Sequence, residues 1–215
     1  TMLFLVRNGN PKGIKDWDDL VKPGVQVIVV NPKTGGNGRM AYLAAWGAVR
    51  KKGGTDALAA EFIAKLYKNV PVLAKGGRDA TSIFLQRNIG DVLITFESEV
   101  VSVDKEFGAG KVDAIHPSSS IVAENPVAVV ERTVAKKGTA AEARAYLNFL
   151  YSDAGQEIAA QHAIRPSNPA ILKKYASTFK PIQLFTVDEF FGSFAEAQKL
   201  HFNDGGQFDK LYTVK

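Results

Sequence analysis

The chain has no cysteine among its 215 residues, which excludes a disulfide framework, a thiolate metal site and a cysteine nucleophile. It also has no apolar run long enough to span a bilayer, since its main apolar stretches, residues 2–6 and 25–30, have the length of strands. Histidine is scarce, and His116, His162 and His201 lie far apart without a carboxylate cluster at ligand spacing. Each is therefore interpreted as a surface or packing residue, and no metal or other cofactor is expected.

Composition and charge restrict the class of protein further. Hydrophobic residues make up 46% and charged residues 23% of the chain, which is the balance of a soluble globular protein and not of a disordered one. The formal net charge of +5 comes from scattered lysines and arginines, and the aromatic residues do not alternate with them. This pattern favours a solvated surface over a nucleic-acid-binding face.

Buried strands and helices alternate along the first half of the chain. Strands are predicted over residues 2–7, 25–30, 70–73 and 91–96, and helices over 16–20, 39–50, 55–67 and 80–86. This alternation predicts an α/β fold with a largely parallel sheet. In the second half we expect strands over 111–115 and 125–130 and helices over 139–150, 154–162 and 188–201, with Ser152 as a helix cap.

Two glycine-rich loops of similar design are the most informative feature. Residues 34–38 (TGGNG) lie between a predicted buried strand and a helix, and residues 76–79 (GGRD) lie between the next strand and helix. Glycine lets a backbone approach a ligand closely, and the first N–H groups of a helix are unpaired and electropositive. Two such ends that converge would form an anion site, to which Thr34 would add a hydroxyl and Arg78 a charge. The simpler alternative is two ordinary strand-to-helix turns, and neither loop is a P-loop or a dinucleotide fingerprint.

Other polar clusters favour structural roles. Asp16, Asp18 and Asp19 fit a charged helix N-terminus, and Glu97 and Glu99 follow a strand end where they would pair with lysine or arginine. The chain shows no nucleophile with an adjacent base and no G-x-S-x-G context, so an enzyme is disfavoured.

At the two loops the sequence resembles the periplasmic sulfate- and thiosulfate-binding proteins of bacterial ABC transporters, which are type II periplasmic binding proteins. The matching stretches follow the family's order along the chain: FLVRNGNP at residues 4–11, NPKT at 31–34, YLAAWG at 42–47, IGDVLI at 89–94, YSDAGQEIAA at 151–160 and LFTVD at 184–188. The resemblance covers nearly the whole chain.

The resemblance implies an α/β fold of two lobes that close on a ligand by hinge motion, with the first lobe incomplete because an N-terminal segment is missing. Residues 1–96 would form mostly the second lobe with both anion-binding loops, residues 97–174 the remainder of the first lobe, and residues 175–215 C-terminal helices that return to the second lobe. It also implies a periplasmic, non-catalytic receptor that delivers its anion to a membrane permease. Residues 1–4 lack the basic region and cleavage site of a signal peptide, so none is expected in this chain. Pairing with the missing segment, or a swapped dimer, is a further expectation.

Family roles carry over to seven positions. The backbone N–H donors of the first loop fall on Gly36 and Asn37, and that of the second loop falls on Gly77. Arg78 matches an arginine behind the site. The remaining positions are those next to or at family donors: Thr34, Gly35 and Phe96.

Two of these positions depart from the family, which has a serine hydroxyl at Gly35 and a tryptophan N–H at Phe96. A hydrogen bond to a charged group contributes roughly 1.5–3 kcal/mol, so the loss of both donors should weaken the binding of sulfate. Thr34 or an ordered water could compensate, or the ligand could be larger than sulfate. A ligand-sensing domain of a transcription regulator and an enzyme of phosphoryl or sulfuryl groups remain as alternatives.

Overall fold

A five-stranded sheet with strand order β3-β2-β4-β1-β5 lies at the centre of the fold. The computed structural model describes residues 1–108 and 110–212. The strands are β1 Met2–Arg7, β2 Val27–Val30, β3 Leu73–Ala74, β4 Val92–Phe96 and β5 Val112–Ile115. β2 is parallel to β3 and β4, whereas β1 is antiparallel to β4 and β5. Four of the five described strands run in the same direction, as expected of a largely parallel sheet, and β1, inserted between β4 and β5, runs the other way and makes the sheet mixed.

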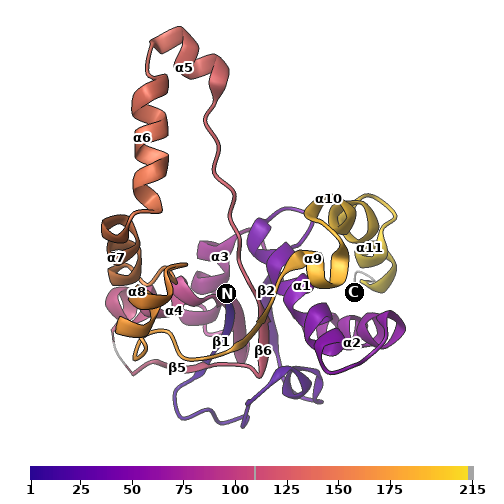
Figure 1. Cartoon of the computed structure of the whole chain (residues 1–215). Helices are drawn as coiled ribbons and strands as arrows, with labels where there is room; N and C mark the ends of the chain where they lie inside the picture. Colours follow the sequence, from indigo (N-terminus) through magenta and orange to yellow (C-terminus); the bar gives the residue numbers. More distant parts are fainter. Residues whose placement is uncertain (109, 213–215) are drawn as a thin grey trace. The chain divides into compact units, whose positions relative to one another are not determined.

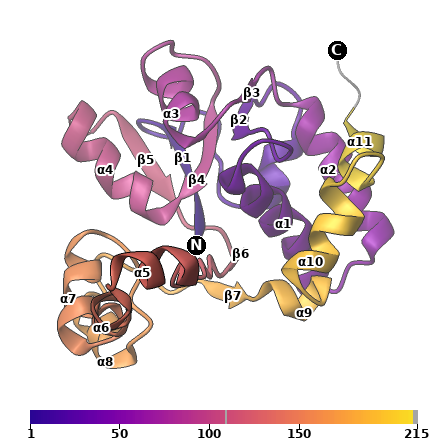
Figure 2. The same ribbon diagram turned by 90° about the horizontal axis from the view of Figure 1, so that it is seen from above.

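Helices cover both faces of this sheet (Figures 1 and 2). α1 Gly36–Lys51 and α2 Asp56–Lys68 pack on one face, and α3 Gly77–Leu85 and α4 Glu97–Phe107 pack on the other. Side chains alternate between the faces along each strand, so that Phe4 enters the core under α1 while the adjacent Leu5 enters the core under α3. The continuous apolar sequence of β1 is explained by this burial on both faces.

The chain after β5 differs most from the prediction. No strand forms over residues 125–130, and the strand in this region is β6 Ser119–Ile121, which pairs in parallel with β7 Gln183–Phe185. β6 was missed because its serines are polar. The Ser120 hydroxyl is fully buried and donates to the Met2 carbonyl oxygen at 2.8 Å.

The helix expected over 188–201 is broken at Gly192, which has a φ of +74°. The C-terminal elements are α9 Val187–Phe191, α10 Phe194–Ala197, the π-helical turn η2 Gln198–Phe202 and α11 Gln207–Leu211. Residues 203–206 separate η2 from α11, as the Asn-Asp-Gly-Gly sequence predicts. The short helix expected over 16–20 is the 3-10 helix η1 Trp17–Val21.

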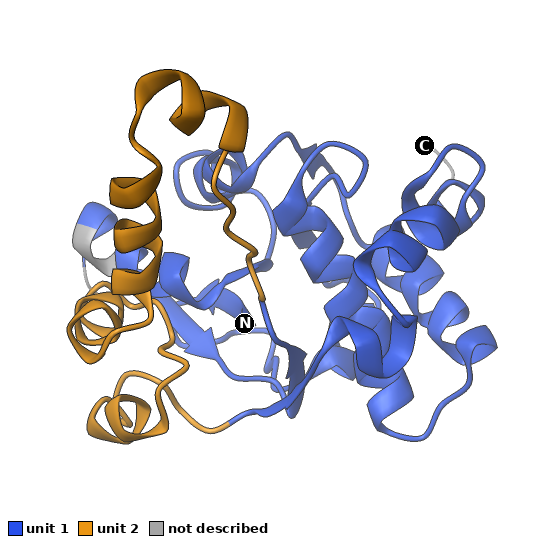
Figure 3. Cartoon of the chain, turned by 45° about the horizontal axis from the view of Figure 1, so that its top comes forward, with its two compact units in different colours: residues 1–123, 182–215 blue, residues 124–181 orange. Residues whose placement is uncertain are grey.

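The chain divides into two compact units, residues 1–123 with 182–215 and residues 124–181 (Figure 3). The second unit is helical, with α5 Glu131–Lys137, α6 Ala140–Leu150, α7 Asp153–Gln161 and α8 Pro169–Lys174. Ser152 caps α7, as predicted, by accepting a hydrogen bond from the Gly155 N–H at 3.1 Å. The lobe boundaries expected at residues 96 and 174 stay a prediction. Within the described residues, no helix is both long and apolar enough to cross a membrane.

Candidate functional site

The two glycine loops leave neighbouring parallel strands at the same edge of the sheet. β2 continues into α1 on one face, whereas β3 continues into α3 on the opposite face. The Asn31 N–H donates to the Ala74 carbonyl oxygen at 2.9 Å, which holds the two strand ends together. Adjacent parallel strands whose connections diverge in this way leave a crevice at their carboxyl ends, where α/β proteins bind ligands.

The loops meet at this edge. A Cβ atom placed on Gly77 would lie 3.7 Å from the Asn37 Nδ2 atom, and one on Gly35 would lie 3.8 Å from the Lys75 carbonyl oxygen. The first turns of α1 and α3 are thus adjacent, although about 40 residues separate them in the chain. The structure brings Gly35, Asn37 and Gly77 together.

Neither helix has a side-chain cap from the described residues. α1 begins after Gly35 and α3 after Gly76, and both glycines are extended N-caps without a side-chain hydrogen bond. By contrast, Thr55 caps α2 by accepting a bond from the Leu58 N–H. Glycine therefore leaves the electropositive ends of α1 and α3 open to an external acceptor.

The other residues of the first loop differ in whether they can offer a hydrogen-bond donor to a ligand. Gly36 is exposed, and a Cβ there would meet nothing within 4 Å. The Thr34 hydroxyl donates to the Asn31 carbonyl oxygen at 3.3 Å, so its proton is used within the loop. A Cβ on Gly35 would lie 2.7 Å from Val30 Cγ1, so that a serine at this position would require Val30 to move. A side chain at position 35 would therefore disturb the packing of Val30 on β2, besides supplying a donor.

The positive charge of Arg78 is paired with a glutamate on another helix. Its exposed guanidinium forms an ion pair with Glu106 at 2.5 Å, and this hydrogen bond raises the pKa of Arg78 above its usual value. Glu106 lies on α4, which the sequence analysis did not predict. Its first turn carries Glu97 and Glu99 directly after a strand, a pattern typical of a helix start that could have revealed it.

Phe96 is the last residue of β4, which is parallel to β2, so its backbone lies at the same edge as the two loops. Its half-buried ring packs against the core on the α1 side of the sheet. α4 begins at the next residue. Three helices therefore start at this edge: the first turn of α4 carries Glu97 and Glu99, that of α3 carries Asp79, and that of α1 has no acidic residue.

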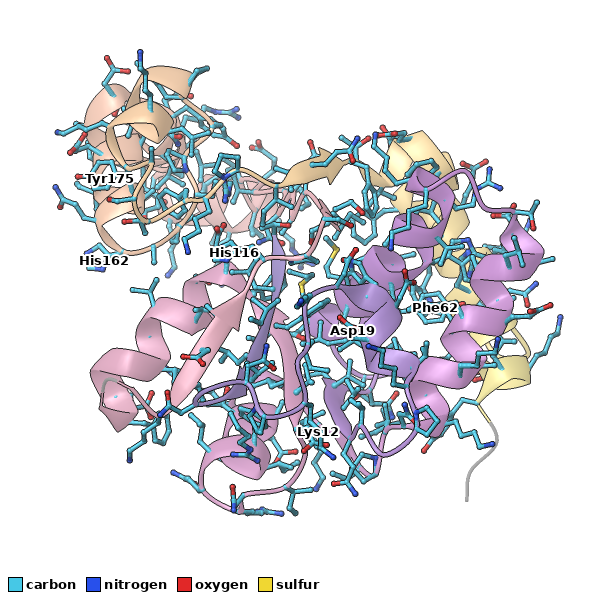
Figure 4. The ribbon with its side chains drawn as sticks, turned by 90° about the horizontal axis from the view of Figure 1, so that it is seen from below. Lys12, Asp19, Phe62, His116, His162 and Tyr175 are labelled. Atoms are coloured by element: carbon cyan, nitrogen blue, oxygen red, sulfur yellow. The ribbon has the colours of Figure 1, made fainter. Side chains whose placement is uncertain are left out.

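The acidic cluster at the start of η1 has the structural role that was expected. Asp19 (Figure 4) accepts hydrogen bonds from the backbone N–H groups of Lys15 and Asp16 and pairs with Lys22 at 2.6 Å. Although burial opposes the shift, these partners lower the pKa of Asp19 to about 2. Asp16 and Asp18 both pair with Lys52.

The three histidines have different surroundings. His162 is exposed at the end of α7 and His116 is half-buried after β5 (Figure 4). His201 on η2 is 2% exposed, and its Nδ1 atom lies 3.0 Å from the Tyr42 hydroxyl. His201 borders a cavity of about 890 Å³ that Trp46, Asp56 and Phe191 also line. None of the seven predicted site residues lines this cavity.

Comparison with known proteins identifies the family of this chain. Residues 1–165 match the family model described as bacterial extracellular solute-binding protein. The chain is 54% identical over 211 residues to a thiosulfate-binding protein of Pseudomonas aeruginosa, covering 98% of this chain and 64% of the relative. It is 50% identical over 212 residues to a sulfate-binding protein of Escherichia coli, again covering 98% of this chain and 64% of the relative.

A solved structure is also similar. The sulfate-binding protein SubI from Mycobacterium tuberculosis superposes with a TM-score of 0.77 at 31% identity, covering 99% of this chain and 68% of that one. Nothing in these comparisons favours a transcription regulator. The chain spans 64% of the length of the two curated relatives. The fold, a mixed sheet with helices on both faces, agrees with this match over residues 1–165. The chain therefore belongs to the bacterial extracellular solute-binding protein family.

Proposed function

We propose that this chain carries part of the binding site of a periplasmic receptor for sulfate or thiosulfate, which delivers its anion to the permease of an ABC importer and catalyses no reaction. The names of the relatives support the ligand class. The observation that carries the proposal is the convergence of the α1 and α3 N-termini, where a Gly77 Cβ would lie 3.7 Å from Asn37 Nδ2.

The chemistry of this edge suits a dehydrated dianion. The donors are backbone N–H groups of Gly36, Asn37 and Gly77, held in place by helices that pack on opposite faces of one sheet. Such donors need little reorganisation when a charge arrives, and hydrogen bonds to an ionised acceptor are about twice as strong as neutral ones. The only arginine among the predicted site residues, Arg78, is already paired with Glu106.

Amide resonances of the ¹⁵N-labelled chain test the proposal directly. Titration with sodium sulfate or sodium thiosulfate should shift the Gly36, Asn37 and Gly77 backbone amides along one saturation curve, whereas sodium chloride at equal ionic strength should not. Asn37→Pro should weaken binding, because proline is tolerated in the first turn of a helix but has no N–H to donate. The proposal is wrong if neither oxyanion shifts these amides, or if the shifts cluster elsewhere.

The Phe96→Trp substitution should raise the affinity for sulfate by about tenfold, because an indole N–H can donate to an oxygen of the anion. The edge position and partial exposure of Phe96 leave the larger ring access to the site. Isothermal titration calorimetry with sulfate and thiosulfate measures the change. Thiosulfate should gain less, since its terminal sulfur is a poor hydrogen-bond acceptor.

The matched control for this prediction is Phe84→Trp, which enlarges a buried aromatic ring of α3 away from the loop. It should not improve the affinity for either anion. An unchanged sulfate affinity in a folded Phe96→Trp variant would show that residue 96 does not face the ligand.

A further inference from the structure

We propose that the cavity between α1, α2 and the C-terminal helices is a second binding site, which takes a planar aromatic carboxylate. Its volume of about 890 Å³ lies within the range of small-molecule sites. All the residues that line it belong to the compact unit formed by residues 1–123 and 182–215. None of them is a predicted residue of the oxyanion site, so this inference goes beyond the proposed function and does not depend on it.

The wall of the cavity is aromatic, which is the first support. The helices α2, α9, α10 and α11 lie beside α1 on this side of the molecule (Figures 1 and 2). The His201 ring centroid lies 4.6 Å from that of Trp46 and 5.5 Å from that of Phe191, and both pairs meet edge to face. Phe190 and Ala60 add further apolar surface to the wall. A flat aromatic ligand can extend this cluster with the ring contacts that it already uses.

A polar atom without a partner is the second support. His201 is 2% exposed, and its Nδ1 atom lies 3.0 Å from the Tyr42 hydroxyl. Its Nε2 atom has no hydrogen-bond partner among the described residues, although buried polar groups are normally paired. When Nδ1 accepts from Tyr42, Nε2 carries the proton and can donate it to a ligand oxygen.

The backbone at this wall is also unusual. The π-helical turn η2 places three consecutive residues, Lys199, Leu200 and His201, on the cavity. π-helical turns are rare and occur frequently at functional sites.

The charges of the cavity select an anion, which is the third support. Each of its three carboxylates already has a donor from the protein. Asp56 lies 3.4 Å from Arg50 Nε, Asp204 lies 3.0 Å from Lys33 Nζ, and Glu196 accepts from a serine hydroxyl at 3.1 Å.

The two lysines of the cavity are in the opposite situation. Lys199 and Lys210 line the cavity, and neither forms an ion pair within the part of the chain that the structure describes. Unpaired ammonium groups beside aromatic rings favour a ligand that combines a flat apolar body with a negative charge. A carboxylate attached to an aromatic ring meets both conditions.

Titration of the ¹⁵N-labelled 215-residue chain with sodium 2-naphthoate tests this inference. The backbone amides of Ala57, Leu200 and His201 should shift along one saturation curve, with a Kd of about 1 mM or below. The matched cation 2-naphthylmethylammonium has the same ring system and should bind at least tenfold more weakly. Sodium sulfate should not displace 2-naphthoate, because the oxyanion site lies elsewhere.

Two variants with a matched control identify the cavity as the site. Ala57→Trp fills the cavity from an exposed position of α2 and should abolish binding, whereas Leu58→Trp, at the adjacent exposed residue outside the cavity, should not. The double variant Lys199→Gln/Lys210→Gln should weaken 2-naphthoate binding about tenfold and remove the preference over the cation. Thermal midpoints equal to that of the original chain would show that these variants are folded.

Three results would each overturn the inference: no saturable shift of the three amides, equal affinity for the anion and the cation, or wild-type affinity in Ala57→Trp. Displacement of 2-naphthoate by sulfate would also overturn it, because the ligand would then occupy the oxyanion site.

Discussion

Replacing Gly38 by alanine should lower the free energy of unfolding by about 1–3 kcal/mol, although alanine is the better helix former by about 1 kcal/mol. A Cβ at this position would lie 2.4 Å from the Val30 carbonyl oxygen and 2.8 Å from the Asn31 carbonyl carbon. These are backbone atoms at the end of β2, so no side-chain rotation relieves the contact. The first turn of α1 would have to move away from the strand.

Urea denaturation followed by circular dichroism measures this effect, and Gly36→Ala is its matched control. Gly36 lies in the same helical turn, but a Cβ there meets nothing within 4 Å. Gly36→Ala should therefore be neutral or stabilising. Gly38→Ala should also weaken anion binding, because displacement of α1 moves its N–H donors. Equal stabilities of the two variants would contradict the close approach of α1 to β2.

Acidification should destabilise the chain through His201, by about 3 kcal/mol between neutral pH and pH 4. Burial lowers the pKa of His201 from 6.5 to about 4. Its ring is 2% exposed and is surrounded by Tyr42, Trp46 and Phe191. The Tyr42 hydroxyl, whose own pKa burial raises, lies 3.0 Å from Nδ1 of this ring. Protonation of His201 would place a charge in these aromatic surroundings.

The direction of the change in stability with pH follows from the pKa of His201 in the unfolded chain and in the folded chain. The unfolded chain takes up the proton near pH 6.5 and the folded chain only near pH 4, so stability is complete above the first value and falls as the pH drops towards the second. Carboxylates such as Asp19, whose pKa is about 2, contribute below this window.

Unfolding free energies measured from pH 7 to pH 4.5 test this prediction. His201→Gln should flatten the pH dependence, whatever its effect on stability at neutral pH. His162→Gln, which changes an exposed histidine, should retain the full slope. A slope that persists in His201→Gln would assign the acid sensitivity to another group.

Local sequence patterns determined much of the fold. The helices α1, α2, α3 and α7 and the strands β1, β2, β4 and β5 form close to the predicted ranges, because apolar periodicity decides which residues are buried. The helix α6 also forms close to its predicted range, although none of its residues is buried. The glycine loops were predicted to precede helices that begin at residues 39 and 80, and these helices begin three residues earlier, at Gly36 and Gly77. The resemblance of the sequence to sulfate- and thiosulfate-binding proteins agrees with the two relatives, whose matches cover 98% of this chain.

Contacts between distant segments decided the rest. The antiparallel insertion of β1 between β4 and β5 depends on pairing partners about 90 to 110 residues away, which periodicity does not specify. β6 is stabilised by Ser120 bonding to Met2, and Arg78 is paired with Glu106 on a helix that the sequence analysis missed. The sequence by itself therefore determined that two helices begin at glycine loops. Only the tertiary structure placed those loops side by side and set the Asn37 carboxamide between them, because neighbouring strands send their helices to opposite faces of the sheet.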